Sequence, residues 1–253
     1  MRAFFILFRK ELRSFFLSPI AYVVIALVML LNGFAFRAGV EALANKPMDT
    51  TLVRLTFDSA LFWYAYFFIF PLITMRLFAE EQKMGTMESL LTAPIRTSQV
   101  VAAKYFAAVA FYCLLWVPSL FNFTLFGWVT GEAGLVPEGP LYCSYTILFF
   151  MGVFNVAVGC LASSLTSNQI IAAVISFTFS VLHFLLGALL TNISSIKYSA
   201  KVNEVISYIA SITHVTTFTS GQLDTRPLVY YSTFAFLFIF LTHKVLEFRR
   251  WKV

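Results

Sequence analysis

Charged residues are scarce in this sequence. Only 12% of its 253 residues are Asp, Glu, Lys or Arg, about half of the share that an ordinary soluble domain carries. Apolar residues make up 60% of the chain, and 30 residues are phenylalanine, so a soluble globule would lack the polar surface to cover its exterior. The same apolar content excludes intrinsic disorder. The composition therefore predicts an all-α polytopic membrane protein.

Groups of residues that could carry catalysis are also missing. The three cysteines, Cys113, Cys143 and Cys160, are too few for a disulfide framework and are not spaced like a zinc or redox site. The sequence has no G-x-x-x-x-G-K-S/T phosphate-binding loop, and no Ser-His-Asp or Cys-His set falls at a common membrane depth. No acidic residue lies in the middle of a long apolar run. We interpret the chain as a non-catalytic protein without a cofactor or a metal site.

Six apolar stretches are long enough to cross a bilayer, which takes about 20 residues of helix. Most of them hold no charge in the middle, and apolar runs of this length without turn signals favour helices over strands. A helix also satisfies its own backbone hydrogen bonds in lipid. The predicted spans are 19–36, 60–77, 105–129, 142–163, 170–190 and 228–245.

The basic residues are divided unequally between the two ends of these spans. Twelve of the 18 Lys and Arg residues fall in the N-terminal segment, the loop after the second span and the C-terminal tail, and six fall on the opposite side. Because cytoplasmic loops carry the excess of Lys and Arg, we expect both termini in the cytoplasm, and the even number of spans agrees. The net charge of +6 is thus a topology signal, and we expect no nucleic-acid binding.

The segment before the first span has the pattern of an amphipathic helix in the cytoplasmic membrane interface. At about 100° per residue, one arc is apolar and holds Phe4, Phe5, Leu7, Phe8, Leu12, Phe15 and Phe16. The opposite arc would face anionic headgroups and holds Arg2, Arg9, Lys10 and Arg13. Glu11 interrupts the apolar arc, and Ser18-Pro19 breaks the helix and starts the first span. The alternative is a frayed leader whose charges only set the topology.

His183 is the one ionisable residue well inside a predicted span. An ionisable residue within the membrane suggests a functional role, but hydrogen bonds to Ser176 and Ser180 would equally make His183 a neutral packing residue. Small residues at helical spacing on the fourth span predict the close approach of another helix, within the chain or at a dimer interface. They are Gly152, Gly159 and Ser163.

The most informative segment lies between the second and third spans, on the side predicted to be cytoplasmic. Two stretches with helical character flank Gly85, which permits a sharp turn. The first stretch carries Glu80 and Glu81, and the second covers 87–91 and is stopped by Pro94. A short, charged helix between two spans is well suited to docking on a soluble partner. An ordinary loop with one helical turn is the alternative.

The same segment closely resembles the signature of ABC-2-type transporter permeases. In that family an Ala-Glu-Glu motif is followed by Gly-Thr and then by Glu-x-Leu-Leu-x-x-Pro. Here these motifs are Ala79-Glu80-Glu81, Gly85-Thr86 and Glu88-Ser89-Leu90-Leu91-Thr92-Ala93-Pro94. Further segments resemble the gliding-motility-associated branch of the family. One covers residues 10–22, and the other consists of residues 221–224 together with 246–251. The resemblance covers nearly the whole chain and includes its six-span layout.

The resemblance implies one transmembrane permease domain over residues 1–253. A connecting helix (1–18) precedes two spans (19–77), a cytoplasmic coupling segment (78–104) precedes three spans (105–190), and an extracytoplasmic segment (191–227) precedes the last span and tail (228–253). The coupling helix would lie in a groove on an ATPase, with the loop 164–169 as a second contact. The residues that the resemblance assigns to ATPase coupling are Phe78, Ala79, Glu80, Glu81, Gly85, Thr86, Glu88, Leu90, Leu91 and Pro94.

The resemblance also implies partners and a location. The chain would be the membrane subunit of an ATP-driven exporter, with two copies of a separate ATPase subunit and a second permease subunit that makes a homodimer or a heterodimer. Membrane lipid and an extracytoplasmic auxiliary subunit are further implied partners. The location would be the bacterial cytoplasmic (inner) membrane. The residues do not identify the transported substrate.

Three other functions stay open at this point. A channel or secondary carrier would work without an ATPase, and Pro71 and Pro118 could break helices as such proteins require. A membrane-embedded enzyme acting on lipid would need acids or histidines that converge at the interface. A membrane anchor for a soluble complex would share every docking feature and lack only a path for substrate.

Overall fold

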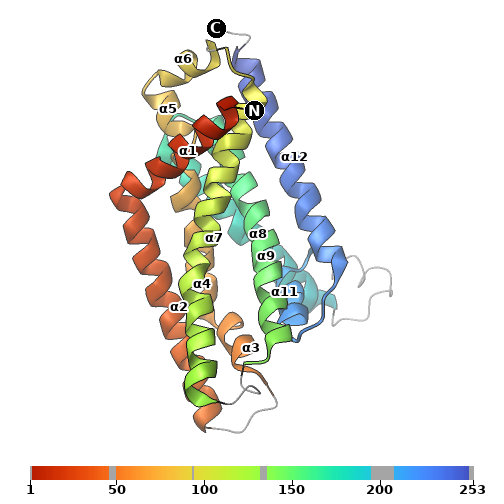
Figure 1. Ribbon diagram of the computed structural model, residues 1–253. Coiled ribbons are helices and arrows are strands. Elements are labelled where there is room, and N and C mark those ends of the chain that lie inside the picture. The colour runs from red at the N-terminus through yellow and green to blue at the C-terminus, as the bar shows by residue number, and fades with distance from the viewer. Residues whose placement is uncertain (1, 46–49, 93, 132–135, 195–207, 251–253) are drawn as a thin grey trace.

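The six predicted spans are present as six long helices in an elongated bundle (Figure 1). The computed structural model describes residues 2–45, 50–92, 94–131, 136–194 and 208–250, and within these ranges it contains no strand. This confirms the predicted fold class. The long helices are α2 (Pro19–Asn45), α4 (Ala60–Thr74), α7 (Thr97–Thr130), α8 (Glu138–Leu165), α9 (Gln169–Ser194) and α12 (Thr225–Arg250). Helix α4 reaches membrane length together with the residues that follow it, as the stretch Ala60–Lys83.

Helices α7 and α8 form the centre of the bundle. Most of their side chains are buried within the chain, whereas most side chains of α2, α9 and α12 face outward. The outward side chains are themselves apolar, including Phe34 on α2, Ile170 on α9 and Phe236 on α12. Apolar side chains on the outside suit a protein whose solvent is lipid.

The small residues of α8 let two neighbouring helices approach it closely. The ring of Tyr112, on α7, lies where a Cβ on Gly152 would be, and Thr74, on α4, lies where a Cβ on Gly159 would be. The close approach that the sequence predicts is therefore made within the chain.

A buried amide group joins three helices near the middle of the bundle. Asn155 of α8 donates a hydrogen bond to the hydroxyl of Tyr66 on α4 (2.9 Å) and accepts one from the hydroxyl of Ser180 on α9 (2.8 Å). All three side chains are buried, so the amide is satisfied without water.

Helix α7 begins earlier than the apolar pattern predicts, at Thr97 rather than at 105. Lys104, which the sequence places in a cytoplasmic loop, therefore lies inside this helix and is buried. The prediction missed this start because the first turns of α7 are buried against protein rather than lipid, and α1 (Arg2–Leu17) is the helix with which α7 has the most extensive contact among the described elements.

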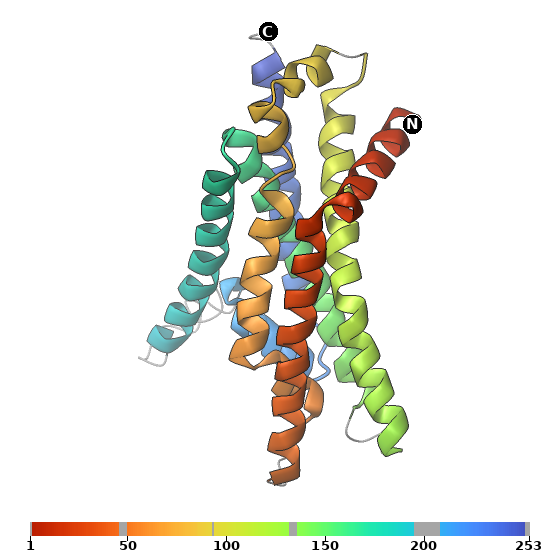
Figure 2. The ribbon, with the colours of Figure 1, turned by 90° about the vertical axis from the view of Figure 1, so that its left-hand side faces the viewer.

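The start of α1 and the end of α12 lie at the same end of the bundle, beside α5 (Ala79–Lys83) and α6 (Thr86–Thr92) (Figure 1). Figure 2 shows α1 leaving the bundle at an angle, with the bend at Ser18. The opposite end carries α3 (Leu52–Phe57) and α11 (Ser211–Thr219). Helix α11 lies in the segment 191–227, of which 195–207 fall outside the described residues.

Candidate functional site

Helices α5 and α6 form a bent segment at the end of the bundle where α1 begins and α12 ends (Figure 1). The bend is at Gly85, whose φ of 70° lies in the left-handed region that glycine adopts without steric cost. A Cβ built on Gly85 would meet no atom of the described residues within 4 Å. Backbone conformation, and not lack of space, is therefore what requires glycine at this turn.

The start of α5 is fixed to α8 by one buried hydroxyl group. The Oγ of Ser163 accepts hydrogen bonds from the backbone N–H groups of Phe78 (3.0 Å) and Ala79 (3.1 Å) and donates one to the carbonyl of Met75 (3.1 Å). Such N–H groups at the start of a helix have no acceptor within the helix itself. Phe78 and Ala79 are both fully buried, so these two predicted coupling residues hold the segment in place and present no surface.

A second set of hydrogen bonds joins α5 to the ends of α8 and α12. The side-chain amide of Gln82 donates to the carbonyl of Ser164 (3.0 Å) and accepts from Arg249 of α12 (2.9 Å). Arg249 also donates to the carbonyl of Leu165 (3.3 Å). Gln82 and Arg249 are functional candidates that sequence reasoning missed, because no local pattern indicates which distant residue a long polar side chain meets.

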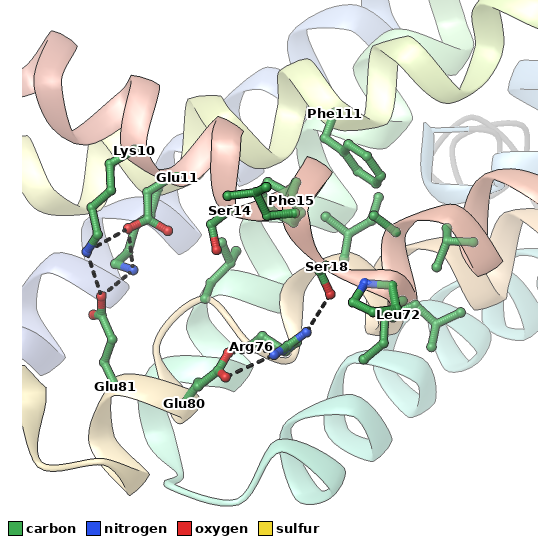
Figure 3. Close-up of a pocket in the computed structure, with 18 of the residues that line it drawn as sticks. Lys10, Glu11, Ser14, Phe15, Ser18, Leu72, Arg76, Glu80, Glu81 and Phe111 are labelled. Atoms are coloured by element: carbon green, nitrogen blue, oxygen red, sulfur yellow. Dashed lines mark hydrogen bonds and ion pairs between the residues drawn. The ribbon is translucent and has the colours of Figure 1, made fainter.

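A buried group of charges joins α5 to α1 and α7. The Nζ of Lys104 lies 2.9 Å from Oε1 of Glu81 and 3.1 Å from Oε1 of Glu11, and the three side chains are only 4%, 14% and 11% exposed. Lys10 lies farther from the same two carboxylates, at 3.7 and 3.9 Å, and is largely exposed (Figure 3). A buried lysine needs such partners to remain charged. The pairing with Lys104 explains why an acidic residue, Glu11, interrupts the apolar face of α1.

Arg76, which follows α4, joins Glu80 to the bend between α1 and α2. Its guanidinium donates to both carboxylate oxygens of Glu80, each at 2.9 Å, and to the hydroxyl of Ser18 at 2.7 Å (Figure 3). Two parallel bonds of this kind fix the geometry of both side chains. Glu80 and Glu81 are therefore both paired within the chain, on the side of α5 that faces α1.

The outer side of the bent segment is exposed. We call Met84, Gly85, Thr86 and Glu88 the α6 edge, because all four are exposed where the chain turns into α6. Met87 is buried and Leu90 is half-buried against the hydrophobic core, while Pro94 is exposed beyond the helix. Leu91 lies in α6, but its side chain is outside the described part of the structure.

Helix α1 covers the segment for which the sequence predicts an amphipathic interface helix, and two of its phenylalanines pack on α7. The ring of Phe15 stacks on Phe111 of α7 with 4.9 Å between centroids, and Phe4 lies 6.3 Å from Phe106. The opposite face is exposed and carries the basic residues Arg2, Arg9, Lys10 and Arg13.

His183, on α9, lies beside α11 and α12 rather than beside α5 and α6. Its Nε2 lies 3.0 Å from the hydroxyl of Tyr230 on α12, and its Nδ1 lies 3.4 Å from the hydroxyl of Ser211 on α11. The alternative in which Ser176 and Ser180 hold His183 differs from these contacts: Ser180 donates to Asn155, and Ser176 Oγ has no hydrogen-bond partner among the described residues. Tyr231 bonds to both Ser211 and His214.

The sequence therefore separates two histidines that the fold brings into one network. His183 was predicted inside a span and His214 on the outer side, but both contact Tyr230 and Tyr231 of α12. Packing of α11 against α8 and α9 causes this approach, and no sequence signal indicates it.

A comparison with protein families gives a match over most of the chain. The family described as "ABC-2 family transporter protein" matches residues 13–183. This range begins within α1, contains all of α5 and α6 and ends within α9. A comparison with curated proteins gives no match.

Proposed function

Because this chain belongs to the ABC-2 family of transporter proteins, we propose that it transmits the motion of a separate ATPase chain to a substrate path through the membrane. Membership in the family, together with six helices of membrane length, makes the chain a multi-pass permease subunit of an ABC transporter. Association with an ABC ATPase follows from the same membership. The contact surface, the direction of transport and the copy numbers are parts of the proposal.

The α6 edge is the surface that we propose to contact the ATPase, and its exposure on an anchored support is the observation that carries the proposal. A surface that transmits the motion of a partner has to be accessible to that partner, and the rest of the chain has to hold it rigidly. Met84 is 62% exposed, and Glu88 offers a negative charge beside it. Directly behind this edge, Ser163 and Gln82 hold α5 to the ends of α8 and α12.

The paired carboxylates play a different part in this proposal. Glu80 and Glu81 face the chain itself, so we assign them to holding α5 against α1 and α7 rather than to binding the ATPase. When the α6 edge moves, Glu81 would carry the motion to Lys104 and Glu11, and Glu80 would carry it to Arg76 and the bend at Ser18. These contacts connect two helices, α1 and α7, to one docking surface.

We propose the remaining features on the basis of charge and family. The excess of Lys and Arg at the α5–α6 end supports a cytoplasmic position for this end, and the family resemblance supports the bacterial inner membrane as the location. The whole chain would act as one permease domain, paired with a second permease subunit and two ATPase subunits in an exporter. The loop 164–169, in which Ser167 and Asn168 are exposed, is the proposed second contact.

Co-purification in mild detergent tests the contact surface. The native chain is compared with Glu88→Lys, which reverses a charge on the α6 edge, and with Glu138→Lys, which makes the same change on an exposed residue at the opposite end. We expect an ATPase chain with the native protein and with Glu138→Lys, and much less with Glu88→Lys.

Each other result has a definite meaning. If all three proteins retain the ATPase equally, the contact surface lies somewhere other than the α6 edge. An ATPase that none of them retains, although each is folded, would favour a channel, a secondary carrier or an anchor.

A further inference from the structure

A cavity of about 670 Å³ lies in the angle between α1, α2 and the α4–α5 connection. Its volume is within the range of sites that hold small molecules, about 300–1,000 Å³. One end of the cavity is polar and the other is apolar, as the side chains in Figure 3 show. The proposal that follows rests on the proposed function, because it takes this end of the bundle to lie at the cytoplasmic membrane surface.

The polar end is lined by equal numbers of opposite charges. Three cationic side chains, of Lys10, Arg76 and Lys104, face three carboxylates, of Glu11, Glu80 and Glu81. Lys104 is fully enclosed, but Lys10 is 62% exposed, and Arg76 and Glu80 are each about one-third exposed. The accessible part of this end therefore offers both a cationic and an anionic group.

Two of these groups have unused bonding capacity. Lys10 lies 3.7 and 3.9 Å from its two carboxylate partners, which is too far for good hydrogen bonds. The Oε2 of Glu81 is buried and has no hydrogen-bond partner among the described residues. An unpaired carboxylate oxygen in a buried place is costly, and a donor arriving from the cavity would remove that cost after a small shift.

The apolar end continues to the outer surface of the bundle. It is lined by Phe15, Ala21, Val24 and Phe111. At its margin Leu17 is 81% exposed. Apolar side chains at an open margin indicate that the cavity opens toward acyl chains rather than toward water.

We propose that this cavity binds one phospholipid whose headgroup carries both a phosphate and a primary ammonium group. Lys10 and Arg76 bind the phosphate, and Glu80 and Glu81 accept hydrogen bonds from the ammonium group. The first part of an acyl chain lies against Phe15, Ala21 and Phe111. The lipid fills the angle between the interface helix and the α4–α5 connection, so it stiffens the connection between them.

The balance of charges selects this headgroup. A purely anionic lipid would satisfy Lys10 and Arg76 but would bring its charge near two carboxylates. A quaternary ammonium group has no N–H and cannot donate to Glu81. A headgroup with a phosphate and a primary amine satisfies both kinds of partner. This preference differs from that of the exposed basic face of α1, which would attract anionic lipid.

Native mass spectrometry of the delipidated full-length chain tests the proposal. The protein is titrated with phosphatidylethanolamine, phosphatidylglycerol and phosphatidylcholine of identical acyl chains. We expect the first phosphatidylethanolamine to bind at least about tenfold more tightly than the other two lipids. Ala21→Phe fills the apolar end and should abolish this preference, whereas Val23→Phe adds the same group to an exposed position on the same helix and should leave it intact.

A second variant keeps the test valid if Ala21→Phe does not fold. Ser14 is exposed and lines the cavity, so Ser14→Trp should narrow the entrance without disturbing the core. The variant should therefore weaken the binding of phosphatidylethanolamine as Ala21→Phe does. Equal binding of the three lipids to the native chain, or an equal loss in Val23→Phe, would overturn the proposal. Recovery of an ATPase is not measured here, so a failure of the lipid site and a failure of the ATPase contact remain distinguishable.

Discussion

The Nζ of Lys104 lies 2.9 Å from Oε1 of Glu81, which joins a central membrane-spanning helix to the bent segment that carries the α6 edge. The ammonium group is almost fully enclosed and has Glu11 as its second partner. Neither carboxylate is free to contact another chain directly. We therefore assign the acidic pair of the signature, Glu80 and Glu81, to contacts within the permease, and we propose that the exposed residues that follow it contact the ATPase.

Lys104→Met should strongly destabilise the protein. The change leaves two buried carboxylates with only the more distant and exposed Lys10 as a cation, and breaking a buried pair in this way typically costs about 3–5 kcal/mol of unfolding free energy. The triple variant Lys104→Met, Glu11→Gln, Glu81→Gln should recover most of this loss, because it leaves no uncompensated charge. Denaturation in detergent measures the unfolding free energy of the single variant and of the triple variant. The matched control is Arg37→Met, which removes an exposed pair with Glu41 and should cost less than about 1 kcal/mol.

Ser163→Ala should loosen the start of α5. It removes the acceptor of two buried N–H groups, and an unsatisfied buried group costs about 1–3 kcal/mol. Hydrogen exchange should become faster at the amides of Phe78 and Ala79. In Ser164→Ala, the hydroxyl that is lost only donates within its own helix, to Leu161, so these amides should keep their protection. Equal exchange in both variants would contradict the anchoring role of Ser163.

Gly85→Ala should weaken the turn before α6 without any steric clash. A non-glycine residue in the left-handed region costs about 1–2 kcal/mol, and the turn would relax away from the docking geometry. We expect lower thermal stability and less co-purified ATPase. Gly33→Ala, at an open site inside α2, should instead raise the thermal stability. Alanine favours a helix over glycine by up to about 1 kcal/mol.

Gly159→Ala should disturb the contact between α8 and α4. The added methyl group would overlap Thr74, and overpacking of this kind costs about 1–3 kcal/mol. Gly127→Ala, inside α7, adds a methyl group that meets no described atom within 4 Å, so it should leave the unfolding temperature equal or slightly higher, because alanine favours a helix. An unfolding temperature that does not fall in Gly159→Ala would contradict the close approach of α8 and α4.

The membrane-spanning helices could be predicted from the sequence because each is encoded by its own residues. An apolar run between Pro19 and Phe36 is enough to predict the presence of α2, although the helix continues to Asn45. Gly85 is enough to predict a turn. Helix α3 was missed because six residues, Leu52–Phe57, are too short to show a period. The length of α7 was underestimated because the residues before 105 pack against α1 and need not be uniformly apolar.

The pairing of side chains at the site could not be predicted in the same way. Glu81 and Lys104 are 23 residues apart, and Gln82 and Arg249 are 167 apart. Their contacts depend on how whole helices pack, which no local pattern specifies. One signal was present, however. The acidic residue on the apolar face of α1, Glu11, breaks the amphipathic pattern, and a buried cation is the physical reason for it.

Cross-linking from the α6 edge tests the central claim most directly. A photo-crosslinking amino acid is placed at Thr86, on the α6 edge. In a separate protein it is placed at Thr130, an exposed residue at the C-terminal end of α7. After irradiation in native membranes, cross-linked chains are identified by mass spectrometry. Our account predicts that position 86 captures a chain with a G-x-x-x-x-G-K-S/T phosphate-binding loop and that position 130 does not. Capture of that chain from neither position, in a complex that still contains it, would contradict the account.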